Sequence, residues 1–123
     1  MNNTIITVNP RIINGILKWN EGDTFYIKWK VNLLKDGVPY DYKEDDQLVV
    51  EFYNKLSKKL VYAFINKNIG TSKTIFLKFT KQISKLFKPG EYTYALKFMR
   101  SSEGDQKIIT IGARFPVEVE RCR

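Results

Sequence analysis

The sequence contains no histidine, a single cysteine and no long apolar run. Histidine is the commonest general base and metal ligand, so its absence removes the usual centre of a catalytic or metal site. Cys122 has no partner for an internal disulfide, which fits folding in a reducing cytosol. We expect no transmembrane helix and no secretion signal, because neither an apolar stretch of about 18 residues nor a basic start with an apolar block is present.

Glycine-rich loops and calcium loops are also missing. The glycines stand singly in ordinary turns, so no phosphate-binding loop is predicted. One acidic loop could offer oxygen ligands to a cation, but it lacks the alternating Asp spacing and central Gly of a calcium loop. Its acids are Asp41, Glu44, Asp45 and Asp46. We therefore expect no metal, no cofactor and no enzymatic activity.

The charges are unevenly distributed along the chain. The formal net charge is +8, from 21 Lys and Arg against 13 Asp and Glu. Between Phe52 and Gly90 there are nine lysines and no acid, whereas six acids lie between Asp36 and Glu51. This separation predicts an acidic and a basic region on one domain. The excess of lysine accompanies much Ile and Asn, as an AT-rich coding sequence would produce, so the charge alone does not indicate a nucleic-acid partner.

Short segments of alternating apolar and polar residues account for most of the chain. A polar segment with one helical face, near residues 80–87, predicts a short helical turn that Thr80 caps and Pro89 ends. We expect one domain over residues 1–123, an all-β, immunoglobulin-like antiparallel β-sandwich of seven to eight strands. A small closed barrel is the alternative. The first expected strand covers residues 3–8 and, after an interruption at Pro10, continues over 12–19. The other segments expected as strands are 25–33, 47–53, 60–65, 74–79, 92–98, 106–111 and 115–119.

The alternation also assigns each side chain to a face. Residues expected in one core between two sheets are Phe25, Ile27, Trp29, Leu48, Val50, Phe52, Leu77, Tyr92, Tyr94 and Leu96. Apolar residues expected on the opposite faces are Tyr26, Val49, Tyr53, Val61, Ile65, Phe76 and Met99. Seven such residues indicate a surface covered by another protein, unless loops of the same chain bury some of them.

The segment from Leu86 to Phe98 joins a Pro-Gly turn to the clearest alternating strand. Pro89 fixes φ and Gly90 tolerates positive φ, so a tight turn leads directly into an extended segment. Leu86, Pro89, Gly90 and Tyr92 have the spacing of a tyrosine corner, in which the Tyr hydroxyl bonds a backbone group a few residues upstream. The alternative is that Tyr92 is simply a core aromatic after a turn.

The order of turn and strand motifs resembles the N-terminal immunoglobulin-like domain of phage baseplate upper proteins, over about residues 14–119. The motifs are Glu21-Gly22-Asp23-Thr24, Asp36-Gly37-Val38-Pro39-Tyr40-Asp41, Leu48-Val49-Val50-Glu51-Phe52 and Phe87-Lys88-Pro89-Gly90-Glu91-Tyr92, with a closing strand from Ile109 to Val119. The resemblance implies a virion component that attaches to neighbouring structural proteins. In that family a linker and a receptor-binding or fibre region usually follow, whereas this sequence stops at Arg123, which favours a baseplate or tail adaptor or a capsid decoration protein.

We therefore expect a structural protein of a tailed-phage virion or phage-tail-like particle, made in the bacterial cytoplasm. Its partners would be other virion proteins and copies of itself. The expected interface combines Lys55, Lys58, Lys59, Tyr53, Ile65 and Phe76 with the acids Asp41, Glu44, Asp45 and Asp46. Two alternatives remain: a carbohydrate-binding module using Tyr26, Tyr53 and Phe76, and a nucleic-acid binder using the lysines from Lys55 to Lys88 with Tyr53, Phe76 and Phe79.

Overall fold

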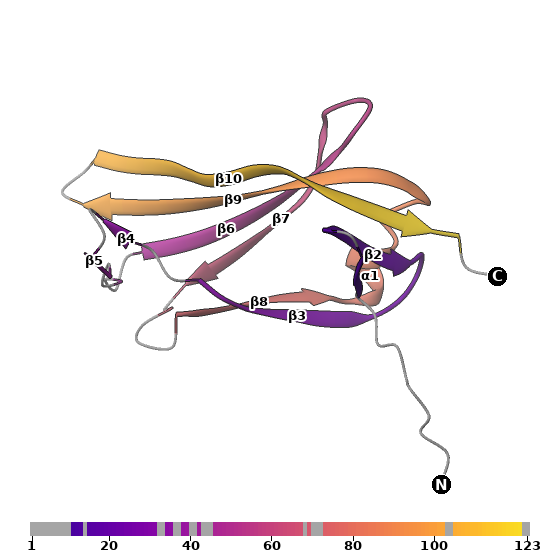
Figure 1. The fold of residues 1–123 in the computed structure, drawn as a ribbon, viewed down its shortest axis with the longest axis horizontal. Helices are drawn as coiled ribbons and strands as arrows, with labels where there is room; N and C mark the ends of the chain where they lie inside the picture. Colours follow the sequence, from indigo (N-terminus) through magenta and orange to yellow (C-terminus); the bar gives the residue numbers. More distant parts are fainter. Residues whose placement is uncertain are drawn as a thin grey trace, which may run out of the picture.

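The chain folds into two β-sheets that pack face to face (Figure 1). The computed structural model describes residues 11–13, 15–31, 34–35, 38–39, 42, 46–67, 69, 73–102 and 105–121. The larger sheet, sheet A, has the order β1-β2-β10-β9-β6-β7, and sheet B is the pair β3-β8. Sheet A comprises β1 (Arg11–Ile13), β2 (Ile16–Asn20), β10 (Asp105–Glu120), β9 (Gly90–Ser102), β6 (Asp46–Asn54) and β7 (Leu60–Lys67). Sheet B comprises β3 (Phe25–Lys30) and β8 (Thr74–Phe79).

The strand order is that of an immunoglobulin-like sandwich. In chain order, β3, β6, β8, β9 and β10 take positions B, C, E, F and G, with B paired to E in one sheet and C, F and G adjacent in the other. The described residues form ten strands, of which seven have five residues or more. The additional short ones are β1 and the separate pair β4 (Leu34–Lys35) and β5 (Val38–Pro39). The predicted all-β sandwich is confirmed, and the barrel alternative is wrong because two distinct sheets form.

The N-terminal strands differ from expectation in two ways. The segment from Ile12 to Trp19 was predicted as one strand, but it forms the hairpin β1-β2, with Gly15 between them at φ +78°. Gly tolerates this left-handed conformation, which allows the chain to reverse there. In addition, β2 pairs in parallel with β10, from Leu17 opposite Val117 to Asn20 opposite Glu120, so the sandwich is not purely antiparallel. The expected strand at residues 3–8 lies outside the described residues.

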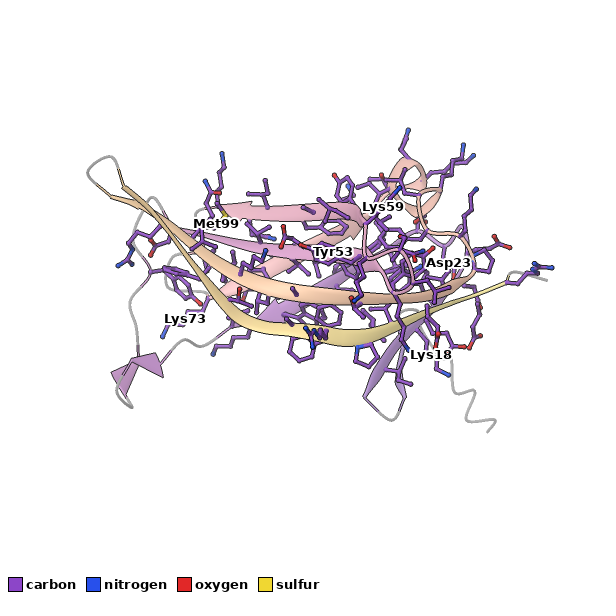
Figure 2. The ribbon with its side chains drawn as sticks, turned by 90° about the horizontal axis from the view of Figure 1, so that it is seen from above. Lys18, Asp23, Tyr53, Lys59, Lys73 and Met99 are labelled. Atoms are coloured by element: carbon purple, nitrogen blue, oxygen red, sulfur yellow. The ribbon has the colours of Figure 1, made fainter. Side chains whose placement is uncertain are left out.

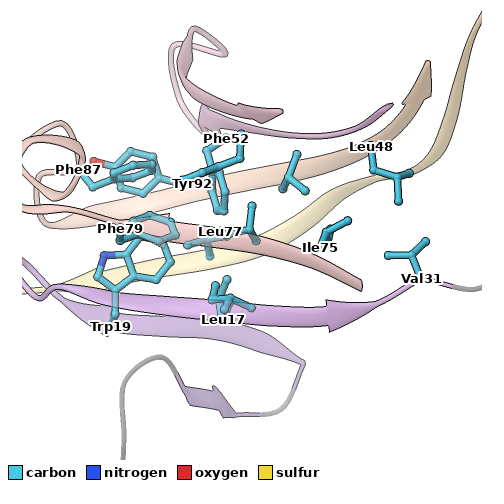
Figure 3. Close-up of a cluster of buried hydrophobic side chains, with 14 of the residues drawn as sticks. Leu17, Trp19, Val31, Leu48, Phe52, Ile75, Leu77, Phe79, Phe87 and Tyr92 are labelled. Atoms are coloured by element: carbon cyan, nitrogen blue, oxygen red, sulfur yellow. The ribbon is translucent and has the colours of Figure 1, made fainter. Parts of the chain in front are cut away.

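Trp19 lies in the core, at its aromatic end near Phe79, and was not among the residues expected there (Figure 3). Its side chain is fully buried, and the rings of Phe25, Phe52, Phe79 and Phe87 lie 5.0 to 6.1 Å from it, centroid to centroid. Trp29, which was expected in the core, is only partly buried and packs against its edge. The periods of the central strands are as predicted, because the expected inward residues of β3, β6, β8 and β9 are all buried or packed against the core.

Two side chains on the outer face of sheet A are nevertheless buried. Val49 lies directly between Ile65 of β7 and Lys97 of β9, and Ala95 is likewise in the middle of the sheet. In a wide sheet, the long side chains of neighbouring strands cover a central short one. The expectation that Val49 is exposed is therefore wrong.

A short helix joins sheet B to sheet A. Helix α1 (Lys81–Ser84) begins after Thr80, whose Oγ1 accepts a hydrogen bond from the Ile83 N–H, as predicted for a cap. The buried Ser84 hydroxyl donates to the backbone oxygen of Asp23, which fixes the helix against the turn between β2 and β3. The apolar residues Ile83, Leu86 and Phe87 were expected to share the apolar face of this turn; Phe87 is buried as expected, whereas Leu86 is half exposed.

The predicted tyrosine corner is present at the start of β9. The hydroxyl of Tyr92 donates a hydrogen bond of 2.6 Å to the Lys88 backbone oxygen, four residues upstream. Burial raises the pKa of Tyr92, so the hydroxyl keeps its proton and remains a donor. Gly90 has φ +150°, a value that side chains disfavour, and its position after Pro89 sets the turn. Leu86 contributes little to this corner because its side chain faces solvent.

Replacing Tyr92 with Phe keeps the ring and removes this bond. We expect Tyr92→Phe to lower the free energy of unfolding by about 0.5 to 1.5 kcal/mol, because the Lys88 oxygen loses a partner in a partly buried place. Urea denaturation followed by tryptophan fluorescence measures the change. The matched control is Tyr26→Phe, which removes a hydroxyl from an exposed ring and should leave the midpoint unchanged. Identical midpoints for all three proteins would show that the corner bond does not stabilise the fold.

Candidate docking groove

A groove crosses the outer face of sheet A beside the turn between β6 and β7. Its volume is about 560 Å³, within the range typical of ligand pockets. The lining residues are Tyr53, Asn54, Lys55, Lys58, Thr93, Ala95, Ala113 and Arg114. A second hollow of about 240 Å³ shares Lys55, Thr93 and Arg114 with it and extends the groove toward Glu118. Figure 2 looks onto this side of the molecule, with Tyr53 over the sheet and Lys59 at the turn.

Small side chains form the floor of the groove. Thr93 and Ala95 alternate with the buried Tyr92 and with Tyr94 along β9, so they face outward, and neither is long enough to fill the space above the sheet. Tyr53 lies opposite Thr93 on β6 and borders this floor. The floor therefore consists mainly of short, largely apolar side chains, and the longer side chains of the other lining residues surround it.

An ion pair beside the floor is internally neutral. Lys97 Nζ lies 2.6 Å from Glu51 Oε1, and the Tyr53 hydroxyl donates to the same oxygen at 2.9 Å. The bond to Glu51 raises the pKa of Lys97, and burial followed by the Glu51 bond raises the pKa of Tyr53. Lys97 thus keeps its positive charge near neutral pH and the Tyr53 hydroxyl keeps its proton. Because Lys97 is paired with Glu51, this cluster adds no net charge to the groove.

The turn between β6 and β7 supplies one cationic wall. The Asn54 side-chain oxygen accepts hydrogen bonds from the backbone N–H groups of Leu56 and Ser57, each at 3.0 Å. The Lys58 N–H donates to the Asn54 backbone oxygen at 2.8 Å. Lys58 has φ +61°, a conformation uncommon for residues other than Gly. These bonds hold the turn so that Lys55 and Lys58 both line the groove.

A bulge in β10 supplies the opposite wall. Its register against β9 shifts between Thr110 and Gly112 and again between Gly112 and Phe115. The Phe115 ring lies over Gly112 so closely that an added Cβ would come within 2.5 Å of a ring carbon, and it stacks on Tyr94 with centroids 4.9 Å apart. Arg114, at φ +61°, lines the groove from this bulge. The contact of the Phe115 ring with Gly112 and its stacking on Tyr94 thus fix the bulge, and with it the position of Arg114.

The groove carries more positive than negative charge. Lys55 lies 3.6 Å from Glu91, and Glu118 at the far end pairs with Lys18 at 3.4 Å. Within the described ranges, Lys58 and Arg114 make no ion pair. Two unneutralised cations on opposite walls of a low apolar floor can hold a carboxylate or phosphate group while apolar atoms contact the floor.

The structure brings together only part of the interface that the sequence predicts. Tyr53, Lys55 and Lys58 line the groove, and Lys59 lies on the same turn, exposed, but outside the lining. Ile65 is 60% exposed on β7, whereas Phe76 belongs to sheet B. Arg114 was missed; the signal available in the sequence was the nearby Gly112 and Pro116, since glycine and proline within a strand often mark a bulge or break.

The acidic half of the predicted interface is not confirmed. Asp46 is 1% exposed, and both its carboxylate oxygens accept hydrogen bonds from Arg100 at 2.6 Å. Its placement on an exposed acidic surface is therefore wrong, because it serves a buried cross-strand ion pair between β6 and β9. Asp41, Glu44 and Asp45 lie outside the described residues.

The residue sets of the two alternative functions are also divided. Tyr26 and Phe76 lie on sheet B and Tyr53 on sheet A, so they do not form the single aromatic row expected of a carbohydrate-binding module. Phe79 is buried in the core and cannot stack on a base. In the part of the chain that the structure describes, no cluster of His, Cys, Asp and Glu could hold a metal ion, and no helix has the length and hydropathy to cross a membrane.

No protein-family model matches the chain, and a search of curated proteins found no relative.

Proposed function

We propose that this chain is a non-enzymatic structural protein of a tailed-phage virion or phage-tail-like particle, held in place by protein–protein contacts through the groove on sheet A. The observation that carries the proposal concerns Lys58 and Arg114, on opposite walls of an apolar floor, which make no ion pair with any residue that the structure describes. An acidic segment of a neighbouring protein complements such a groove, and its carboxylates set the register of the contact. The order of turn and strand motifs that resembles phage baseplate upper proteins supports the same assignment.

A second copy of the chain can supply the acidic segment. Four acids lie in the segment from Asp36 to Asp45: Asp36, Asp41, Glu44 and Asp45. A contact between unlike surfaces of identical chains is heterologous, and it closes into a ring or winds around a tube. Exposed apolar side chains near the groove, such as Ile65, add affinity, because charges mainly guide encounter and orientation. The chain then belongs in the virion, as a baseplate or tail adaptor or as a capsid decoration protein.

Charge reversal in the groove tests this function. We expect the variant Lys55→Glu, Lys58→Glu, Arg114→Glu to be absent from purified particles, because three acids repel the acidic partner. Particles are isolated by density gradient from a host that carries only the variant gene, and the chain is detected by immunoblot. The expected result is loss of incorporation by at least roughly tenfold, since like charges juxtaposed at an interface cost several kcal/mol.

The matched control reverses three exposed lysines outside the groove, Lys81, Lys85 and Lys88, and makes the same change in net charge. It should incorporate normally. Both variants should unfold at the wild-type midpoint, because all the altered side chains are exposed. If the groove variant enters particles as well as the control does, the groove is not the attachment surface.

A further inference from the structure

The outer face of sheet B alternates aromatic rings with lysines. The register places Tyr26 opposite Lys78 and Lys28 opposite Phe76, and all four point away from the core because Ile27, Ile75 and Leu77 are buried. Tyr26 is 66% and Phe76 51% exposed. Each ring therefore has a lysine directly across the ladder and another two positions along its own strand.

The cations on this face have no acidic neighbour on their strands. Lys28, Lys30 and Lys78 are exposed, and β3 and β8 contain no Asp or Glu. The Lys28 ammonium lies 5.7 Å from the centre of the Phe76 ring, a cation–π distance. A face of this kind attracts anions through three lysines and offers two ring faces to a flat apolar group.

The position of Phe76 is fixed from the other sheet. Its backbone N–H, on the open edge of β8, donates to the Asn66 side-chain oxygen of β7 at 2.9 Å. At the far end of the pair, the Val31 N–H donates to the Lys73 backbone oxygen at 2.7 Å. These two bonds hold the β3-β8 pair in place. The strands that carry the Tyr26 and Phe76 rings therefore lose little conformational entropy when a ligand stacks on the rings.

We propose that the outer face of sheet B binds single-stranded nucleic acid. Unpaired bases stack on exposed rings whatever their sequence, and neighbouring lysines contact the phosphates of the same strand. The alternation favours this partner over an acidic protein segment, because each aromatic site adjoins a cationic site, as each base adjoins a phosphate. The proposal is independent of the groove on sheet A, which lies on the other sheet.

Binding is measured by fluorescence anisotropy with labelled oligo-dT and oligo-rU of about 15 nucleotides, close to the upper site size of a single domain. We expect the logarithm of the affinity to fall with the logarithm of salt concentration with a slope of about −2, because three lysines release about 0.7 counterion per phosphate on single strands. Whichever of the two oligonucleotides binds more tightly shows whether DNA or RNA is the preferred ligand. A duplex of equal length should bind less tightly, because its bases cannot reach the rings.

Substitutions distinguish base stacking on the two rings from a general attraction between a basic protein and a polyanion. Tyr26→Ala and Phe76→Ala should each weaken binding by roughly five- to hundredfold, the range measured for lost base stacking. Lys28→Ala with Lys78→Ala should flatten the slope to about −0.7. The control Lys85→Ala with Lys88→Ala removes the same charge from exposed positions after α1 and should leave the slope unchanged.

Three results would overturn the proposal: no binding at low salt, equal affinity for the duplex, or unchanged affinity of both ring variants. The last two would show only a general attraction of a basic protein for polyanions. Unfolding midpoints of the variants are measured alongside, and they should match the wild type because every altered side chain is exposed.

Discussion

Replacing Trp19 with Ala is expected to lower the free energy of unfolding by about 3 to 5 kcal/mol, the usual cost of removing a large aromatic side chain from a core. The Trp19 ring is fully buried, and four phenylalanine rings from both sheets and from the segment after α1 surround it. No neighbouring side chain can move into a space of that size without losing its own contacts. Urea denaturation followed by circular dichroism measures the loss.

The control for this prediction is the other tryptophan. Trp29 is only partly buried, and its main aromatic contact is a stacked arrangement with Tyr94 at 5.4 Å. Trp29→Ala should therefore cost less than Trp19→Ala, because part of its surface already faces water. Equal losses would contradict the conclusion that Trp19, and not Trp29, is the tryptophan of the buried core.

Replacing Asp46 with Ala is expected to destabilise the fold by about 3 to 5 kcal/mol, because the change leaves the charge of Arg100 without its buried partner. Arg100 is directly opposite Asp46 in the β6-β9 ladder and holds both carboxylate oxygens. The Arg100 guanidinium also lies 5.4 Å from the Phe98 ring, which fixes its plane. Thermal and urea unfolding of the variant measure the loss.

The double variant Asp46→Ala, Arg100→Met distinguishes a lost ion pair from lost packing. Replacing both charged partners by apolar groups removes the uncompensated charge, so the double variant should be more stable than Asp46→Ala alone. The single variant Arg100→Met completes the comparison. If the double variant loses as much stability as Asp46→Ala and Arg100→Met lose together, the two residues do not interact energetically.

The central strands could be predicted because each has a clear period of two. Ile27 in β3 and Leu77 in β8 alternate with polar or exposed residues, so the sequence indicated both the strand and its inward face. Trp19 was missed because β2 is only five residues long and follows a hairpin turn at Gly15. So short a strand has too few residues to show a period, and its parallel pairing with β10 depends on residues about 100 positions away.

The groove was partly predictable for a related reason. Lys55 and Lys58 were recognised from the local concentration of lysines, which is visible in sequence. Arg114 comes from the opposite end of the chain, and its side of the groove is set by the bulge where Phe115 covers Gly112. Asp46 was misplaced because neighbouring acids suggested a solvated loop, while its partner Arg100 lies 54 residues away.

The parallel pairing of β2 with β10 also determines how the domain carries mechanical load. Force that pulls on the chain before β1 and after β10 first separates β1 from β2, one ladder bond after another, because those strands are antiparallel. The load then acts on the start of β2 and the end of β10, which lie at opposite ends of their shared ladder. The bonds from Leu17 to Asn20 are then sheared together instead of opening in sequence. Under such a force the β1-β2 hairpin opens first, and the parallel β2-β10 pair then bears the load until its bonds break together.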